Sequence, residues 1–245
     1  MIVFGGWGGH QTLRSDTCML NVPALCWLSP PPLALVRGPS DRQGHSLVAA
    51  GDEVRAPASS QLLLFGGETF TIPSNELWAF KNLARGPARE DDRLHWMQLK
   101  PSGTWPKARS GHSACMLSPN EMVVFGGRGA GKDCLNDLHV LSVSSLRWST
   151  PRLHGDVPRP RWAAACCLLP SRLPSSAGWT LRWLLDGGRD FDGWVDEQVV
   201  ANVAISAAGE VTLNCHALGP SLGHPSLELA GDAVRDTVVS GHTLT

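Results

Sequence analysis

One stretch of this chain has a glycine and lysine spacing that could bind phosphate. Gly126-Gly127-Arg128-Gly129-Ala130-Gly131-Lys132-Asp133 matches the phosphate-loop pattern G-x-x-x-x-G-K up to its last position. That position needs Ser or Thr to hold magnesium, and Asp133 would repel phosphate there. A phosphate loop also needs a following helix, whereas residues 136–142 alternate polar and apolar side chains as a strand does. We therefore predict that these glycines serve backbone geometry and that Lys132 binds no nucleotide.

Histidine and cysteine offer no metal site by their spacing. The nine His and seven Cys contain no C-x-x-C and no H-E-x-x-H arrangement, which are typical spacings of metal ligands. Cys166 and Cys167 are adjacent on a predicted strand, so they face opposite sides and cannot easily chelate one ion. We predict no metal and no cofactor. The odd number of cysteines, most of them in apolar runs, indicates reduced thiols and a cytoplasmic or nuclear protein.

Glycine pairs divide the chain into repeats. A strand-like apolar run closes on Gly-Gly four times, with the first glycine at positions 5, 66, 126 and 187. A fixed period of about 60 residues indicates units that bury their apolar faces by stacking on neighbours. Each pair is expected to end its strand, because glycine permits a positive φ and a close backbone approach.

The third unit predicts four antiparallel strands. Residues 109–117 form the first strand, turn residues occupy 118–121, and the continuous apolar run 122–125 is a strand buried on both faces. Residues 136–142 form the third strand, and the fourth begins at Leu146. Four antiparallel strands per unit make one blade of a β-propeller.

These units resemble the kelch repeat family. The shared pattern is Arg-x-Gly-His, the apolar run with Gly-Gly, an Asn-Asp/Glu-Leu strand and an outer-strand Trp, followed by Pro-x-x-Arg. It is clearest from Arg42-Gln43-Gly44-His45 to Trp96 and from Arg109-Ser110-Gly111-His112 to Trp148. His45 and His112, which recur within it, are interpreted as structural. In the fourth unit Trp162 stands where His is expected, and Asp186 replaces the Phe before the glycines.

The resemblance implies an all-β kelch-type β-propeller of which about four blades are seen. We assign the blades to residues 1–37, which lack the first strand, 38–105, 106–155 and 156–218. Residues 219–245 begin a further blade or supply a closing strand. We favour a segment of a larger propeller over a four-bladed ring closed by residues 223–229 on residues 2–4, because an open sheet edge needs a partner.

Enzymes built on this fold are the alternative class. Copper radical oxidases resembling galactose oxidase need tyrosine, and this chain has none. The Glu-x-x-x-Asp-x-x-x-His loop of iron-dependent specifier proteins is also missing from the sequence. A triad assembled from distant positions stays open, since sequence spacing does not show it. We predict a non-catalytic protein-interaction module, an adaptor or scaffold, with an enzyme or enzyme subunit on the same propeller as the alternative.

The loops after the glycine pairs are the predicted binding face. In proteins resembling this one they line one face, where partners dock; here they are residues 7–16, 68–75, 128–135 and 189–197. Aromatic and Arg side chains are the usual anchors of protein interfaces. The alternative is that each aromatic packs on its own loop. The predicted partner-binding residues are Trp7, Phe70, Arg128, Lys132, Arg189, Phe191 and Trp194.

The chemistry of that face predicts a protein partner with an acidic segment that carries an apolar side chain. A formal net charge of −1 provides no general attraction to nucleic acid, and no apolar stretch is long enough to span a membrane. We predict neither a nucleic-acid nor a membrane partner. The inserted turns 51–61 and 170–178 are the second candidates for partner contacts, and 82–93 is a third insertion; they are more simply read as tolerated surface loops.

Overall fold

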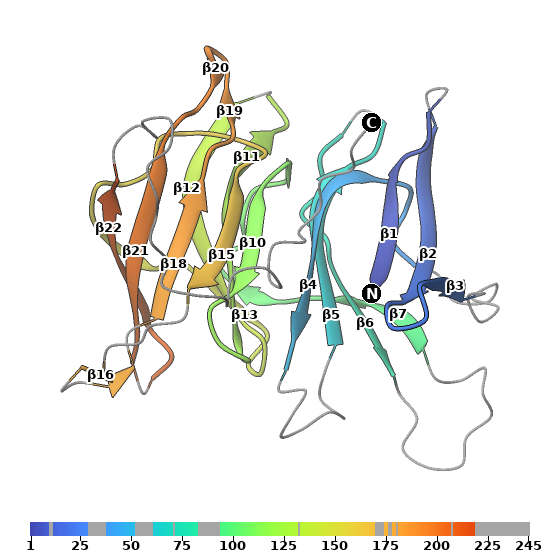
Figure 1. Cartoon of the computed structure of the whole chain (residues 1–245), viewed down its shortest axis with the longest axis horizontal. Coiled ribbons are helices and arrows are strands. Elements are labelled where there is room, and N and C mark those ends of the chain that lie inside the picture. Colours follow the sequence, from blue (N-terminus) through green and yellow to red (C-terminus); the bar gives the residue numbers. More distant parts are fainter. Residues whose placement is uncertain are drawn as a thin grey trace.

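The computed structural model describes residues 1–9, 12–28, 38–51, 61–70, 72–82, 94–131, 133–169, 174–175, 178–179, 181–206 and 208–218. All regular elements in these residues are strands, and no helix capable of crossing a membrane is found among them. The main strands form four sheets, which we number as blades 1 to 4 in chain order. Blade 1 lies at one end of the molecule and blade 4 at the other (Figure 1). The predicted all-β propeller segment is confirmed.

The first two blades differ in their number of described strands. Among the described residues, blade 1 consists of three antiparallel strands and blade 2 of four. The strands are β1 (Ile2–Trp7), β2 (Leu13–Asn21) and β3 (Cys26–Leu28) in blade 1, and β4 (Gln43–Ala50), β5 (Gln61–Glu68), β6 (Leu77–Asn82) and β7 (Leu94–Leu99) in blade 2.

Blades 3 and 4 each gain an outer strand that the sequence did not predict. In both, the segment entering the blade pairs in parallel with its last strand, outside the four antiparallel ones. Blade 3 contains β8 (Ser102–Gly103), β9 (Arg109–Ser110), β10 (Ser113–Met116), β11 (Glu121–Gly129), β12 (Cys134–Ser142) and β13 (Arg147–Ser149). Blade 4 contains β14 (Arg152–Gly155), β15 (Ala165–Leu169), β18 (Leu181–Asp186), β21 (Gln198–Ile205) and β22 (Val211–Ala217).

Two short hairpins project from blade 4 at opposite ends (Figure 1). One is β16 (Pro174–Ser175) with β17 (Gly178–Trp179), which overlaps the inserted turn 170–178. The other is β19 (Arg189–Asp190) with β20 (Gly193–Trp194), within the loop after the last glycine pair. Because β1, β5, β11 and β18 are equivalent strands, the loops that follow them lie at the β19–β20 end. We call this end the loop face.

The glycine pairs do not end their strands in blades 1 to 3, and that prediction was wrong. Strands β1, β5 and β11 continue through the pair. In blade 3, Gly126 and Gly127 have φ of 62° and 98°, and the pairing with β12 shifts between Phe125 and Gly127. Positive φ therefore produces a β-bulge that redirects the strand while pairing continues. Only β18 ends before its glycines.

Alternate residues of each blade face opposite neighbours, and the hydrophobic cores lie between blades. Leu63 and Phe65 pack with Met122 and Val124 of blade 3, whereas Leu64 packs with Phe4 of blade 1. A third core joins blades 3 and 4. This two-sided burial explains the continuous apolar runs that precede the glycines, since a strand buried on both faces shows no polar alternation.

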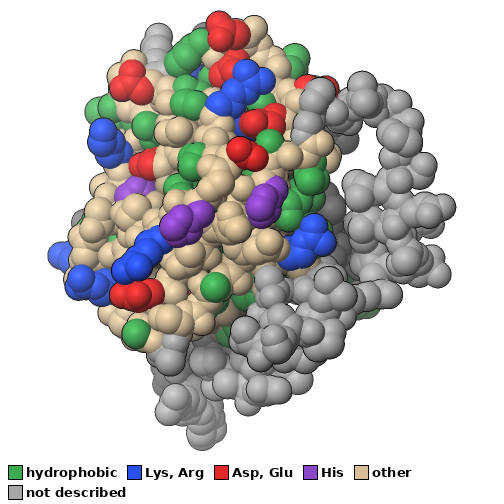
Figure 2. Space-filling view, turned by 90° about the vertical axis from the view of Figure 1, so that its left-hand side faces the viewer, with side chains coloured by type: hydrophobic (Ala, Val, Ile, Leu, Met, Phe, Trp, Pro, Cys, Tyr) green, Lys and Arg blue, Asp and Glu red, His purple; other side chains and the backbone are tan. Residues whose placement is uncertain are grey.

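The outer face of blade 4 has a different character. Arg182, Asp186 and Asn202 are exposed there, and Figure 2, which shows this side of the molecule, displays charged and His side chains spread over it. Asp186 occupies the position that Phe125 holds in blade 3. The ring closure that we had considered, residues 223–229 on residues 2–4, lies outside the described residues.

Candidate protein-binding site

One buried arginine in each of blades 2 to 4 holds the loop face in place. It belongs to the Pro-x-x-Arg segment that enters the blade. Its Nε donates to the carbonyl two residues earlier, and its Nη1 donates to the carbonyl of the first glycine in the pair. The guanidinium also meets an acidic residue near the start of the third strand, and we call this set of contacts an arginine clasp. The clasps pair Arg42 with Glu76, Arg109 with Asp137 and Arg161 with Glu197.

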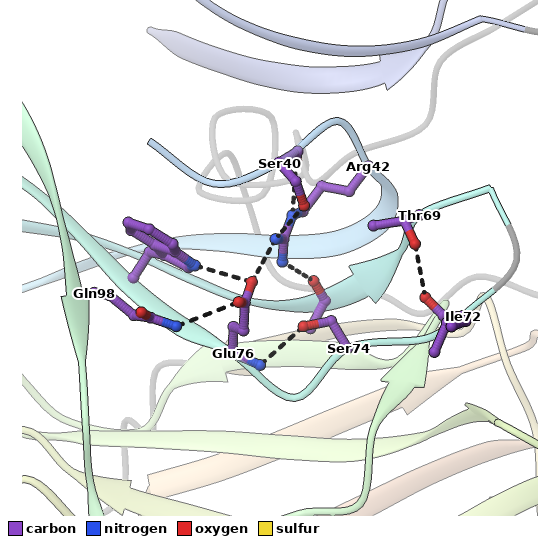
Figure 3. A network of polar contacts seen from close by, with 9 residues as sticks. Ser40, Arg42, Thr69, Ile72, Ser74, Glu76 and Gln98 are labelled. Carbon is purple, nitrogen blue, oxygen red and sulfur yellow. Dashed lines mark hydrogen bonds and ion pairs between the residues drawn. The ribbon is translucent and has the colours of Figure 1, made fainter. Parts of the chain in front are cut away.

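The clasp of blade 2 is part of a wider polar network (Figure 3). Arg42 Nη2 lies 2.6 Å from Glu76 Oε2, and the carboxylate also accepts hydrogen bonds from Trp78 Nε1 at 3.2 Å and Gln98 Nε2 at 3.3 Å. Burial alone would raise the pKa of Glu76, but the hydrogen bonds from Arg42 and Trp78 outweigh it and lower that pKa. The carboxylate is therefore charged at neutral pH and fixes the start of β6.

The clasp of blade 3 is bidentate. Arg109 Nη1 and Nη2 donate to the two carboxylate oxygens of Asp137, each at 2.7 Å. Such paired contacts are among the stronger charge-assisted hydrogen bonds. Burial would raise the pKa of Asp137, but His139 and Arg109 together hold it well below its usual range.

The clasps could have been found in the sequence. Arg42, Arg109 and Arg161 recur at one repeat position, and acidic residues recur at another. Opposite charges at two fixed positions of a buried repeat indicate pairing, because an unpaired buried charge is too costly to retain. The sequence analysis identified both the Pro-x-x-Arg segment and the Asn-Asp/Glu-Leu strand, but it did not predict that their charged residues pair with each other.

His112 is buried and His45 is partly buried between blades, which supports the structural interpretation. The His45 ring contacts Phe4 edge-on with centroids 5.5 Å apart, and His112 contacts Phe65 in the same way at 5.2 Å. Burial, with a smaller contribution from Arg42, lowers the pKa of His45 to about 4. Burial, with a smaller contribution from Arg109, lowers the pKa of His112 to about 3. Both rings are neutral in the folded protein at pH 7.

We expect stability to fall as the pH is lowered from 6.5 toward 4. The unfolded chain protonates these histidines near pH 6.5, whereas the folded chain does so only near their lowered pKa values, so the unfolded state binds more protons in this window. The loss is about 1.4 kcal/mol per pH unit for each His. Urea unfolding at pH 7.5, 6.5 and 5.5 measures it. His112→Ala should roughly halve the slope, and an unchanged slope would contradict the assignment.

An arginine–aromatic cluster lies on the loop face where blades 3 and 4 meet. The Arg128 guanidinium stacks over the Trp162 ring at 5.2 Å, and that ring contacts Phe191 with centroids 5.6 Å apart. The Arg189 guanidinium lies over Trp194 at 4.7 Å. The arginine–aromatic cluster therefore consists of Arg128, Trp162, Arg189, Phe191 and Trp194.

The β19–β20 hairpin positions this cluster. Its backbone pairs Arg189 with Trp194, and Asp190 Oδ1 closes the turn by accepting from the N–H groups of Asp192 and Gly193 at 2.9 and 3.0 Å. Two further backbone hydrogen bonds tie Arg189 to Trp162, which brings the hairpin against the segment entering blade 4. Backbone hydrogen bonds therefore hold Arg189, Trp194 and Trp162 in place.

The cluster exposes apolar area that folding does not require. Trp194 is 78% exposed and Phe191 is 64% exposed. Within the described part of the chain, Arg128 and Arg189 form no ion pair, while the neighbouring Arg159 and Arg161 are paired with Asp190 and Glu197. The two exposed aromatic rings can contact an apolar group of a partner, and the two guanidinium groups, which stack on Trp rings without an ion pair, can contact an acidic group. Asp192 and Asp196 are also exposed on this segment, so the local charge is mixed.

The other predicted binding residues stand apart from this cluster. Trp7 is 53% exposed at the end of β1 in blade 1, and Phe70 is 63% exposed in the loop after β5, close in sequence to exposed Ile72. Both lie on the loop face, but no contact joins them to the cluster in the part of the chain that the structure describes. Lys132 lies outside that part. The phosphate-loop-like stretch runs along β11 into a turn, and the strand β12 follows it.

The sequence analysis did not include Trp162 among the binding residues, and it aligned Trp162 with the wrong position of the repeat. Ala163, with φ of 54°, occupies the position of Gly111, and Ala164 lies against Gly188 as His112 lies against Gly127. Trp162 therefore corresponds to Ser110, and Ala164 takes the place of the His. An aromatic side chain at a position held by Gln43 and Ser110 in other blades was the available signal.

Comparison with known proteins gives one family and several relatives. The model of the KLHDC2/KLHL20/DRC7 Kelch-repeats domain matches residues 56–195. Kelch domain-containing protein 3 of Homo sapiens is 36% identical over 159 residues, which are 60% of this chain and 37% of that protein. The Bos taurus protein of the same name is 34% identical over 183 residues, covering 69% of this chain and 43% of its own length. Dynein regulatory complex subunit 7 of Chlamydomonas reinhardtii is 30% identical over 154 residues, which cover 62% of this chain and 11% of that protein.

Solved structures agree on the fold. The structure of YjhT matches with a TM-score of 0.50 at 16% identity, covering 82% of this chain and 52% of that chain. A chain of the RAG complex with one melted and one unmelted RSS matches with a TM-score of 0.54 at 15% identity, covering 76% and 55%. The present chain spans less than half the length of the curated relatives it matches.

Proposed function

The chain belongs to the kelch-repeat family, and we propose that it is a non-catalytic module that docks a protein partner through the arginine–aromatic cluster. Kelch repeats are commonly protein-interaction modules. The observation that carries the proposal is the exposure of Trp194 and Phe191 beside stacked arginines on a hairpin with paired backbone. Aromatic and Arg side chains of this kind dominate binding energy in protein interfaces.

The partner that this chemistry favours is an acidic segment carrying an apolar side chain. Arg128 and Arg189 offer charge-assisted hydrogen bonds to carboxylates, while the faces of Phe191 and Trp194 offer apolar contact. Trp7 and Phe70 would extend the contact along the loop face for a longer partner. Affinity should fall as salt is added, because exposed charges are screened beyond about 8 Å at physiological ionic strength.

A charge-removal variant tests this proposal. We expect a triple variant to capture roughly tenfold less partner from lysate, because anchor residues each contribute over 1 kcal/mol of binding free energy. It combines Arg128→Ala, Lys132→Ala and Arg189→Ala. The variant should melt like the parent chain. The matched control, Arg147→Ala, Arg152→Ala and Arg182→Ala, removes three exposed arginines elsewhere and should capture the partner normally.

Undiminished capture by the first variant would contradict the assignment. The inserted turns 51–61 and 170–178, whose flanking strand ends lie at the opposite end of the blades, would then become the better candidates.

A further inference from the structure

Two cysteine side chains meet between blades 3 and 4. Cys115 lies on β10, the first antiparallel strand of blade 3, and Cys166 lies on β15, the first antiparallel strand of blade 4. Both are free thiols. Both also pack against the hydrophobic core that joins the two blades, so the pair spans an interface between structural units.

The strand register directs both side chains at the same core. Cys115 pairs with Val123 of β11, and Cys166 pairs with Leu185 of β18. Val123 and Leu185 are buried members of the core between blades 3 and 4, and directly paired residues project to the same face of a sheet. Cys167, which follows Cys166, projects to the opposite face. The pair therefore points into one interface from its two sides.

Hydrogen bonds between the blades fix the two strands against each other. Ser113 Oγ donates to the Ala164 carbonyl at 2.5 Å, and one step earlier the Ala163 N–H donates to the Gly111 carbonyl at 2.7 Å. These contacts advance together along both chains, so the two strands run in the same direction. Each cysteine of the pair comes two residues after one end of the Ser113–Ala164 hydrogen bond. The thiols are thus brought level with each other.

The equivalent position between blades 2 and 3 holds no thiol. Val48 and Ala114 occupy it, and both pack against the core of that interface. They align with the two cysteines when each blade is counted from the residue that lies against its second glycine. An aliphatic pair is therefore enough to fill this position. Two cysteines add the ability to form a covalent bond.

We propose that Cys115 and Cys166 are a modification site, at which hydrogen peroxide converts the two thiols into a disulfide that joins blade 3 to blade 4. The Cys166 sulfur attacks one peroxide oxygen, which becomes the hydroxyl of a sulfenic acid while the other oxygen leaves as water. The Cys115 sulfur then attacks the Cys166 sulfur. The S–S bond forms as the S–OH bond breaks, and the hydroxyl leaves with the Cys115 proton as a second water. Each sulfur is oxidised by one electron, and the peroxide is reduced by two.

The surroundings of the pair favour this order of steps. A hydrogen bond with Cys166 and burial raise the pKa of the Cys115 thiol well above its usual range. Since the thiolate is the nucleophile, Cys115 is the poorer group for the first attack and acts second, on a sulfur already beside it. Both side chains are only partly buried, which leaves access for a molecule as small as hydrogen peroxide.

Peroxide treatment of the full chain tests the proposal. Peptide mapping after alkylation of the remaining thiols should recover a Cys115–Cys166 disulfide. The melting temperature should rise by about 5–10 °C, because a disulfide constrains the unfolded chain, and should return to its starting value in dithiothreitol. Cys115→Ser and Cys166→Ser should each abolish the response, and the matched control Cys167→Ser should keep it.

A double variant separates packing from redox chemistry. Cys115→Val with Cys166→Ala reproduces the pair found between blades 2 and 3, so it should melt like the reduced parent chain and show no response to peroxide. A disulfide that used any other cysteine, oxidation of Cys166 that stopped at the sulfinic acid, or an unchanged melting temperature would each overturn the proposal. The triple-alanine variant of the arginine–aromatic cluster should form the disulfide normally, so failure of the docking proposal would be seen separately.

Discussion

Replacing Arg109 with Met should lower the free energy of unfolding by about 3–5 kcal/mol, because it removes one partner of a buried ion pair. Arg109 is fully buried, holds both carboxylate oxygens of Asp137, and donates to the carbonyls of Gly126 and Lys107. Met keeps most of the side-chain volume, so lost packing contributes little. Urea unfolding followed by tryptophan fluorescence measures the effect.

Arg147→Met is the matched control for that experiment. Arg147 lies exposed on β13 in the same blade and forms no ion pair within the described residues, and surface substitutions of this kind stay within about 0.5 kcal/mol. If the two variants unfolded at the same urea concentration, the clasp would not be what holds the entry to blade 3 against its glycine pair.

Gly126→Val should destabilise the chain by about 3 kcal/mol or more, combining backbone strain with steric overlap. Gly126 has φ of +62°, and a Cβ there would lie 2.6 Å from the Arg161 carbonyl oxygen and 3.0 Å from that of Leu135. Both neighbours are backbone atoms, one of them in the segment entering blade 4, so neither can rotate away. Thermal unfolding by circular dichroism gives the comparison.

Gly129 supplies the control on the same strand. Its φ lies outside the left-handed range, and the nearest atom to an added Cβ is 3.9 Å away. Gly129→Ala should therefore leave the melting temperature nearly unchanged. A Gly126→Val chain as stable as Gly129→Ala would show that the bulge tolerates side chains, and the repeated glycines would need another explanation.

The sequence predicted the features that recur in every repeat. Glycine pairs and the apolar runs before them located β1, β5, β11 and β18, because two-sided burial between blades removes polar alternation from these strands. The parallel outer strands β8 and β14 were missed, since they are only two and four residues long and pair through their backbone, which leaves little pattern in the side chains. The bulges were not predicted, because a glycine pair that bends a strand has the same sequence pattern as a glycine pair that ends one.

The candidate site was predictable by residue type and less so by arrangement. Arg128, Arg189, Phe191 and Trp194 were named from interface chemistry. Their assembly depends on Trp162, which joins Arg128 to Phe191 across two blades. Blade stacking brings these residues together although they are distant in sequence. The fourth repeat departs from the common pattern, so its alignment with the other repeats did not show which position Trp162 occupies. Trp7 and Phe70 share the loop face but belong to other blades.

Hydrogen exchange of the chain with and without its captured partner tests the binding assignment most directly. We expect slowed exchange at residues 189–197 and 128–131 and at the start of blade 4 around Trp162, with residues 51–61 and 170–178 unchanged. Protection confined to those inserted turns, with unaltered exchange across β19 and β20, would contradict docking through the arginine–aromatic cluster.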